Sequence, residues 1–140
     1  IFTPMKTSKF GYALVLAIWL AVPAFAQKKY DNTLKKADDL YQDGAYKKAL
    51  KTLQSFKKSV TSKLGQQNNY MPQYYLRYAK TNLALGVLSN FESSLESALS
   101  SSQNVYGENS TSYASTLIDV AAIYNTYGNY REARSYTIKA

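Results

Sequence analysis

The chain of 140 residues contains neither cysteine nor histidine. Without cysteine it forms no disulfide, offers no thiolate nucleophile and has no N-terminal cysteine to carry a lipid. The absence of both residues also removes the usual ligands of zinc, copper and haem iron and the commonest general base of enzymes. The composition therefore predicts a protein that has no cofactor and no bound metal and is not an enzyme.

Long apolar runs are scarce as well. The run at residues 12–22 has eleven residues, which is short of the roughly 17–25 that a membrane-spanning helix needs. It follows two lysines and is followed at residues 23–26 by the small residues of a cleavage site. This pattern predicts a secretory signal peptide at residues 5–26, with residues 1–4 as upstream sequence without structural meaning. We expect an exported protein, periplasmic or secreted, with no membrane span once the signal is cleaved.

Acidic residues are few, and the positive charge is concentrated in one segment. Between Lys28 and Lys63 the chain has ten lysines and four aspartates, whereas residues 64–140 carry five basic and five acidic residues. One interpretation is weak attraction to anionic surfaces such as polysaccharide or lipid head groups. The other, which the spacing favours, is the solvated outer face of amphipathic helices. Export argues against nucleic acid as a partner.

What is present is a helical pattern that recurs. In residues 113–140, Leu117, Val120, Ala121 and Tyr124 have the i, i+3, i+4, i+7 spacing of one helix face, and a glycine follows. This predicts two short helices joined by a turn at Gly128. Small residues on both helices would let them approach closely, so that the Tyr two residues after the turn packs across them.

The same hairpin is found twice more when the segments are aligned on the turn. The first copy turns at Gly44, and we place the second turn at Ser89 and Asn90. The three turns then recur with a period of about 42 residues, which predicts an array of helix pairs. We expect one domain at residues 27–140, with units of about 30–63, 72–103 and 111–140 and polar connectors at residues 64–69 and 104–110.

These residues resemble the tetratricopeptide repeat family, and the third unit resembles its longer kinesin-light-chain type. The resemblance rests on a combination of glycine, alanine and tyrosine positions. The residues that define the repeat are Ala37, Gly44, Tyr46, Ala49, Leu117, Ala121, Tyr124, Gly128, Tyr130 and Ala133. The resemblance implies an all-α fold, a right-handed solenoid of about three stacked antiparallel hairpins.

In this family the first helices of the hairpins line a concave face that binds a peptide or a partner domain. The resemblance implies such a face here, made by Leu34, Asp38, Tyr41, Leu76, Ala79, Leu83, Ile118, Ala122 and Asn125. Spacing alone favours a core role for several of these residues. The face lacks the basic and amide side chains with which the family clamps a terminal carboxylate, so that mode is not expected.

Three hypotheses about function remain open. The first is a non-enzymatic scaffold that binds a protein or peptide. The second is an N-terminal sensor or assembly module of a longer protein with a protease or kinase downstream, because residue 140 falls inside a predicted helix and suggests truncation. The third is a peripheral protein that contacts anionic surfaces through residues 28–63.

Overall fold

The computed structural model describes the backbone of residues 9–140 and the side chains of residues 24–140. Over this range the chain is helical and has no strand, which confirms the all-α class. The helices are α1 (Lys9–Gln42), α2 (Tyr46–Leu64), α3 (Met71–Ala84), α4 (Leu88–Tyr106), α5 (Thr111–Tyr127) and α6 (Tyr130–Lys139). Residues 1–32 and 33–140 are two compact units.

The first unit holds the N-terminal part of α1. The predicted signal peptide, residues 5–26, falls mainly on residues whose side chains are outside the described part of the chain. Within the described residues, no helix is both long and apolar enough to cross a membrane.

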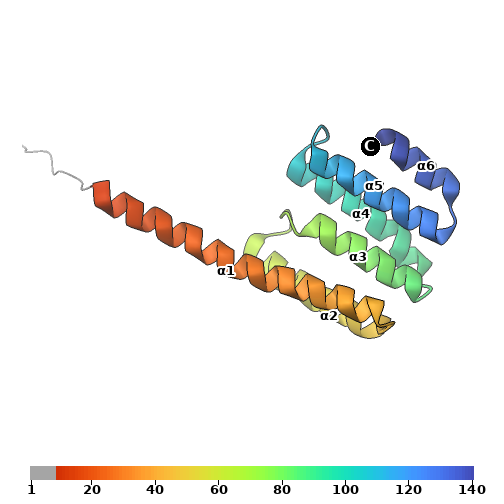
Figure 1. Ribbon diagram of the computed structural model, residues 1–140, viewed down its shortest axis with the longest axis horizontal. Coiled ribbons are helices and arrows are strands. Elements are labelled where there is room, and N and C mark those ends of the chain that lie inside the picture. Colours follow the sequence, from red (N-terminus) through yellow and green to blue (C-terminus); the bar gives the residue numbers. More distant parts are fainter. Residues whose placement is uncertain (1–8) are drawn as a thin grey trace, which may run out of the picture. The chain divides into compact units, whose positions relative to one another are not determined.

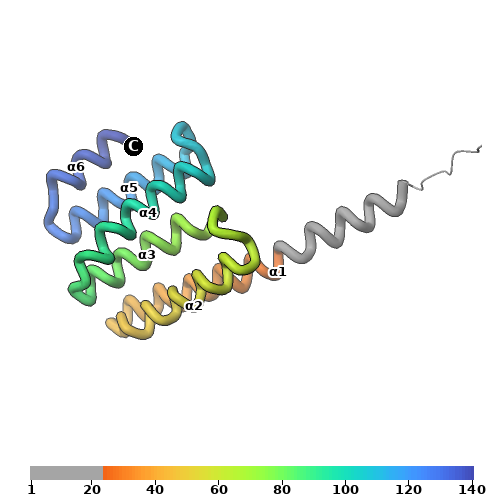
Figure 2. Tube along the Cα trace, turned by 180° about the vertical axis from the view of Figure 1, so that it is seen from behind, coloured from red at the N-terminus to blue at the C-terminus, as the bar shows by residue number. Residues whose placement is uncertain are grey.

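The second unit contains the helices in adjacent pairs. The end of α1 runs beside α2, α3 packs on α4, and α5 packs on α6, while α2 also contacts α3 and α4 contacts α5. Within this unit, the end of α1, α3 and α5 lie in one layer, and α2 and α4 lie in a second layer (Figures 1 and 2). In the odd-numbered layer α3 contacts α5 directly.

Glycines mark the ends of the helices at a constant interval. The described residues with positive φ are Gly44, Gly65, Gly86, Gly107 and Gly128, and the interval between successive glycines is the same throughout. Two intervals make one hairpin, so each full repeat has the length of the segment from Gly44 to Gly86. This length, about 42 residues, lies in the range of helix-pair repeats. The predicted second turn at Ser89 and Asn90 is therefore wrong, because both residues lie inside α4.

The turn inside each hairpin has the same hydrogen bonds. At Gly86 the backbone N–H donates to the Leu83 carbonyl, and the next N–H, of Val87, donates to the carbonyl of Asn82. Gly44 and Gly128 make the equivalent pair of bonds. This pair of hydrogen bonds requires a residue with positive φ just after the helix. Glycine adopts positive φ without strain.

The connectors between hairpins also repeat. Asn68 donates to the Gly65 carbonyl at 2.7 Å and accepts from a backbone N–H two residues on. Ser110, one full repeat later, donates to the Gly107 carbonyl at 2.8 Å and accepts from the N–H of Tyr113. The second connector is shorter than predicted, because α4 continues to Tyr106 before its glycine.

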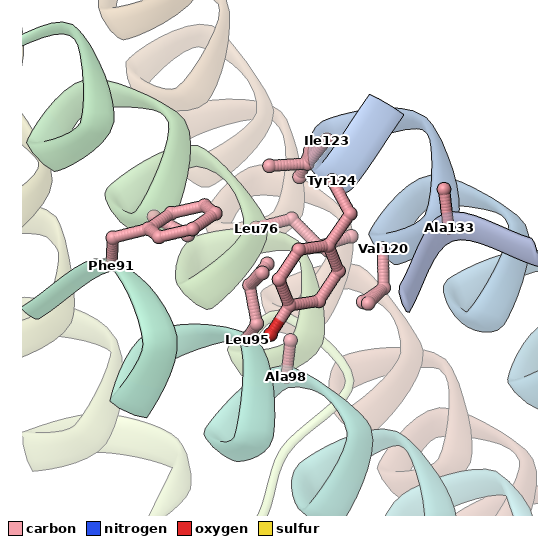
Figure 3. Packing of buried hydrophobic residues seen from close by; sticks show 9 residues of the cluster. Leu76, Phe91, Leu95, Ala98, Val120, Ile123, Tyr124 and Ala133 are labelled. Carbon is pink, nitrogen blue, oxygen red and sulfur yellow. The ribbon is translucent and has the colours of Figure 1, made fainter. Parts of the chain in front are cut away.

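The core lies where the two layers meet. Figure 3 shows side chains from α3, α4, α5 and α6 converging on one cluster, with Phe91 and Leu95 fully buried. Tyr46 packs against Tyr41 with ring centroids 5.2 Å apart. The expected packing of Tyr130 is not found, because its side chain is 69% exposed at the first position of α6. The small residues of the hairpins are buried: Ala37, Ala49, Ala79, Ala98, Ala121 and Ala133.

Candidate functional site: a groove across three helices

The odd-numbered helices form a groove of about 490 Å³, called the central groove below. Helix α1 supplies three of its lining residues, α3 supplies five and α5 supplies four. They are Asp38, Tyr41 and Gln42, then Gln73, Leu76, Arg77, Lys80 and Leu83, then Asp119, Ala122, Ile123 and Thr126.

The constant repeat explains why these residues meet. Asp38, Lys80 and Ala122 are each one full repeat apart and occupy the same place on successive helices. Arg77 and Asp119 are also one full repeat apart and occupy equivalent places on α3 and α5. Equivalent positions on neighbouring parallel-running helices lie side by side, so the groove is a product of the repeat itself.

Two of the lining residues, Asp38 and Arg77, form an ion pair that links α1 to α3. Arg77 Nε donates to Asp38 Oδ1, and Nη2 donates to Oδ2, each at 2.9 Å. The third nitrogen, Nη1, donates to the side-chain oxygen of Gln73 at 2.8 Å. A bidentate arginine–carboxylate pair has a defined geometry. Arg77 is thus held in place, and its charge is neutralised by Asp38.

Lys80 lies next to this pair and is exposed. Its Nζ is 5.1 Å from the centroid of the Tyr41 ring, within the range of a cation–π contact. Within residues 24–140, no hydrogen bond or ion pair is formed by this ammonium group. The three N–H donors of Lys80 are therefore available to a ligand.

Asp119 faces the groove from the α5 side. Partial burial raises the pKa of its carboxyl above the usual value, and the positive charges of Lys80 and Arg77 oppose this rise. Among the described residues it accepts no hydrogen bond. Asp119 is thus a partly desolvated acceptor without a bonded donor, a state that a ligand N–H would relieve.

The floor of the groove is apolar and rigid. Leu76 and Ile123 line it and also belong to the core cluster, where both are buried (Figure 3). Ala79, which is fully buried, belongs to the same cluster. Because Leu76 and Ile123 belong to a packed core, the position of the floor itself is well defined.

The structure divides the predicted concave face into three groups. The residues that line the groove are Asp38, Tyr41, Leu76, Leu83 and Ala122. Leu34 and Ala79 are instead buried in the core. Ile118 and Asn125 are exposed on α5 but do not line the groove.

Sequence reasoning missed the charged residues that dominate the groove. Arg77, Lys80 and Asp119 were not among the predicted contacts, although all three lie on the predicted first helices. The signal was available in Gly86. Aligning the second hairpin on this glycine places Lys80 at the position of Asp38 and Arg77 at the position of Asp119.

The groove combines charged and polar side chains with an apolar floor. No cluster of three or more metal-binding side chains occurs among the residues that the structure describes. A bound chain could place an amide or cationic N–H at Asp119, a carbonyl or carboxylate at Lys80 and an apolar side chain on the floor. Comparison of the chain with protein-family models, with curated proteins and with solved structures found no match.

Proposed function

We propose that residues 33–140 bind an extended peptide segment of a protein partner in the central groove, as a non-enzymatic scaffold. The hairpins would form a right-handed solenoid of the tetratricopeptide type, in an exported protein. The observation that carries the proposal is the groove itself, in which an unbonded donor and an unbonded acceptor flank an apolar floor.

The size of the groove suits a short peptide. Packed helices lie about 8–10 Å apart, so three neighbours span roughly 16–20 Å. An extended chain advances about 3.3 Å per residue, and about five or six residues would cross the groove. A segment of this length has enough backbone and side-chain groups to use Lys80, Asp119 and the floor together.

The second hypothesis from the sequence fits the same groove. A sensor or assembly module that precedes an enzymatic domain would also need a surface for a partner segment. The two proposals differ in what lies beyond residue 140 and agree on the binding surface, so one experiment on the groove tests both.

The test is selection from a displayed library of random linear peptides on the immobilised chain. We expect enriched peptides whose affinity falls by about tenfold or more in Asp119→Lys and in Lys80→Glu, because each replacement puts a repelling charge beside a ligand group. Glu108→Lys, in the exposed connector after α4, is the control with the same charge change as Asp119→Lys and should leave affinity unchanged. A library that yields no enriched peptide, or peptides insensitive to both groove variants, contradicts the proposal.

A further inference from the structure

The first hairpin has a second groove, which shares no residue with the central groove. It lies between α1 and α2 and has a volume of about 490 Å³. It is called the basic groove below. It is lined by Thr33, Lys36, Leu40, Lys48, Lys51, Thr52 and Ser55. Three lysines and no carboxylate line it, and α2 as a whole carries six lysines and no acidic residue.

In the third hairpin the equivalent surface is covered by a helix. The repeat places Tyr124 at the position of Leu40 and Tyr136 at the position of Thr52. Helix α4 lies against Tyr124, whose ring is 5.7 Å from that of Phe91, and Tyr136 stacks on Tyr124 with ring centroids 5.6 Å apart. The face of a hairpin at these positions is therefore one on which the preceding helix packs.

In the second hairpin α2 takes the corresponding role. Tyr75 stands at the position of Thr33, and the Lys57 ammonium of α2 lies 5.2 Å from the centroid of its ring. Next to it, Tyr74 stacks on Phe56 of α2 with centroids 6.4 Å apart. Each even-numbered helix of the first two hairpins thus covers the next hairpin.

The first hairpin differs from the third in chemistry at this surface. Lys36 stands where the third hairpin has the fully buried Val120, and Lys51 stands at the place of a serine. Lys48 replaces Glu132. Among residues 24–140, the ammonium groups of these lysines form no hydrogen bond or ion pair. Only Leu40 and the lysine stems provide apolar contact.

The helix that covers the third hairpin shows which ligand suits the basic groove. Burial raises the pKa of Tyr124 most, followed by the neighbouring Tyr136 and the carboxylates of Glu92, Glu132 and Glu96; Glu92 and Glu96 lie one turn apart on α4. Carboxylates spaced four residues apart on a covering helix thus reach this surface. On the first hairpin, such carboxylates would lie beside Lys36, Lys48 and Lys51, whereas on the third hairpin they lie beside Tyr124 and Glu132.

We propose that the basic groove docks an acidic amphipathic helix of a protein partner, placed as α4 is placed on the third hairpin. The helix would set an apolar residue on Leu40 and carboxylates at i and i+4 against Lys36, Lys48 and Lys51. The groove has the form that helices occupy elsewhere in this chain, and its charge selects an acidic one.

The probe is a synthetic helical peptide with the spacing of α4, in which Phe, Glu, Leu and Glu stand at positions i, i+1, i+4 and i+5. Its control is the same peptide with both Glu replaced by Gln. Binding to the full chain is followed by fluorescence anisotropy. We expect the Gln peptide to bind about tenfold more weakly, since it loses its charge pairs, and the affinity of the acidic peptide to fall with added salt.

The matched variants separate the groove from the general charge of α2. The groove variant replaces Lys36, Lys48 and Lys51 with Glu, and the control replaces three exposed α2 lysines outside the groove, Lys47, Lys58 and Lys63, with Glu. We expect loss of about tenfold or more for the groove variant and a change within about threefold for the control. A Lys→Gln triple at the groove positions, which adds no repulsion, should show a smaller loss in the same direction.

Three results would overturn the proposal. Equal losses in the two triple variants would mean attraction to the overall charge of α2. Tighter binding of a sulfated oligosaccharide or of anionic lipid vesicles than of the peptide, with the same dependence on the groove lysines, would assign the groove to a polyanion. Absence of peptide binding at low salt would leave the basic groove as a solvated surface.

Discussion

The ion pair between Asp38 and Arg77 offers a test of how the central groove is held together. It joins α1 to α3 through two hydrogen bonds of 2.9 Å between side chains that are distant in the sequence. The perturbation is a double-mutant cycle with Asp38→Asn, Arg77→Met and the double variant. Methionine keeps the apolar length of the arginine stem, so the cycle reports mainly on the pair.

The size of the coupling follows from the exposure of the two side chains. Arg77 is 25% exposed and Asp38 is 44% exposed. Hydrogen bonds to charged groups contribute about 1.5–3 kcal/mol when shielded, whereas exposed ion pairs contribute about 0.2–1 kcal/mol. Because water still reaches Asp38, we expect a coupling free energy of about 1 kcal/mol, which should decrease with salt.

The assay is urea unfolding of each variant followed by circular dichroism. The control cycle is Lys35→Met with Asp39→Asn, which removes an ion pair with the same 2.9 Å separation but with side chains 73% and 60% exposed on one helix. We expect clearly weaker coupling there, because both charges stay solvated. If the two cycles gave equal coupling, or if the Asp38–Arg77 coupling were zero within error, shielding and the link between helices would not be the source of stability.

Three further predictions concern single positions. Gly86→Ala should lower the free energy of unfolding by about 1–2 kcal/mol through backbone strain alone, because φ is +75° and the added Cβ meets no other atom. Asparagine tolerates positive φ, so Gly86→Asn should lower it less in the same urea titration. Burial and the neighbouring Tyr136 raise the pKa of Tyr124 to about 12, so its contribution to stability is complete below about pH 10 and is lost as the pH rises through 12. In Tyr124→Phe, the free energy of unfolding should therefore fall less steeply as the pH rises above about 10. The control Tyr130→Phe changes an exposed side chain and should leave this pH dependence as it is in the original chain. Burial raises the pKa of Asp119 above 3.8, so the protonated form is the better tolerated one in the folded chain; Asp119→Asn should be more stable than the original chain at neutral pH, and acid titration of unfolding should show this advantage shrinking toward pH 3.8.

The helical class and most helix positions could be predicted from the sequence because periodicity and glycine are local signals. The first and third turns lie at Gly44 and Gly128 as predicted, where tyrosine and alanine follow at helical spacing. The second is misplaced because the alignment equates Phe91 with the tyrosine after the turn. Phe91 lies three residues further along α4, and fully buried it belongs to the packing between helices.

The groove was harder to predict because its important groups are defined by contacts between helices. Periodicity assigns Leu76 and Ala79 to one face of α3. It cannot show that Ala79 is buried within the core, whereas Leu76 lies in the core and also lines the groove. Charged residues such as Arg77 read as solvated surface until a partner is found. That partner, Asp38, lies in the preceding hairpin. The two residues are recognised as neighbours only when the second hairpin is aligned on Gly86.

The register also explains why the two grooves differ in kind. Positions such as those of Asp38, Lys80 and Ala122 stay open in all three hairpins, so substitutions there shape one continuous surface. Positions such as that of Lys36 are covered by the preceding helix in the third hairpin, where Val120 is fully buried. A lysine covered by an apolar helix would bring an unpaired charge toward the core, which is costly. Lysine at residue 36 therefore favours water, or a covering helix that supplies carboxylates, over an apolar helix such as α4 at this position.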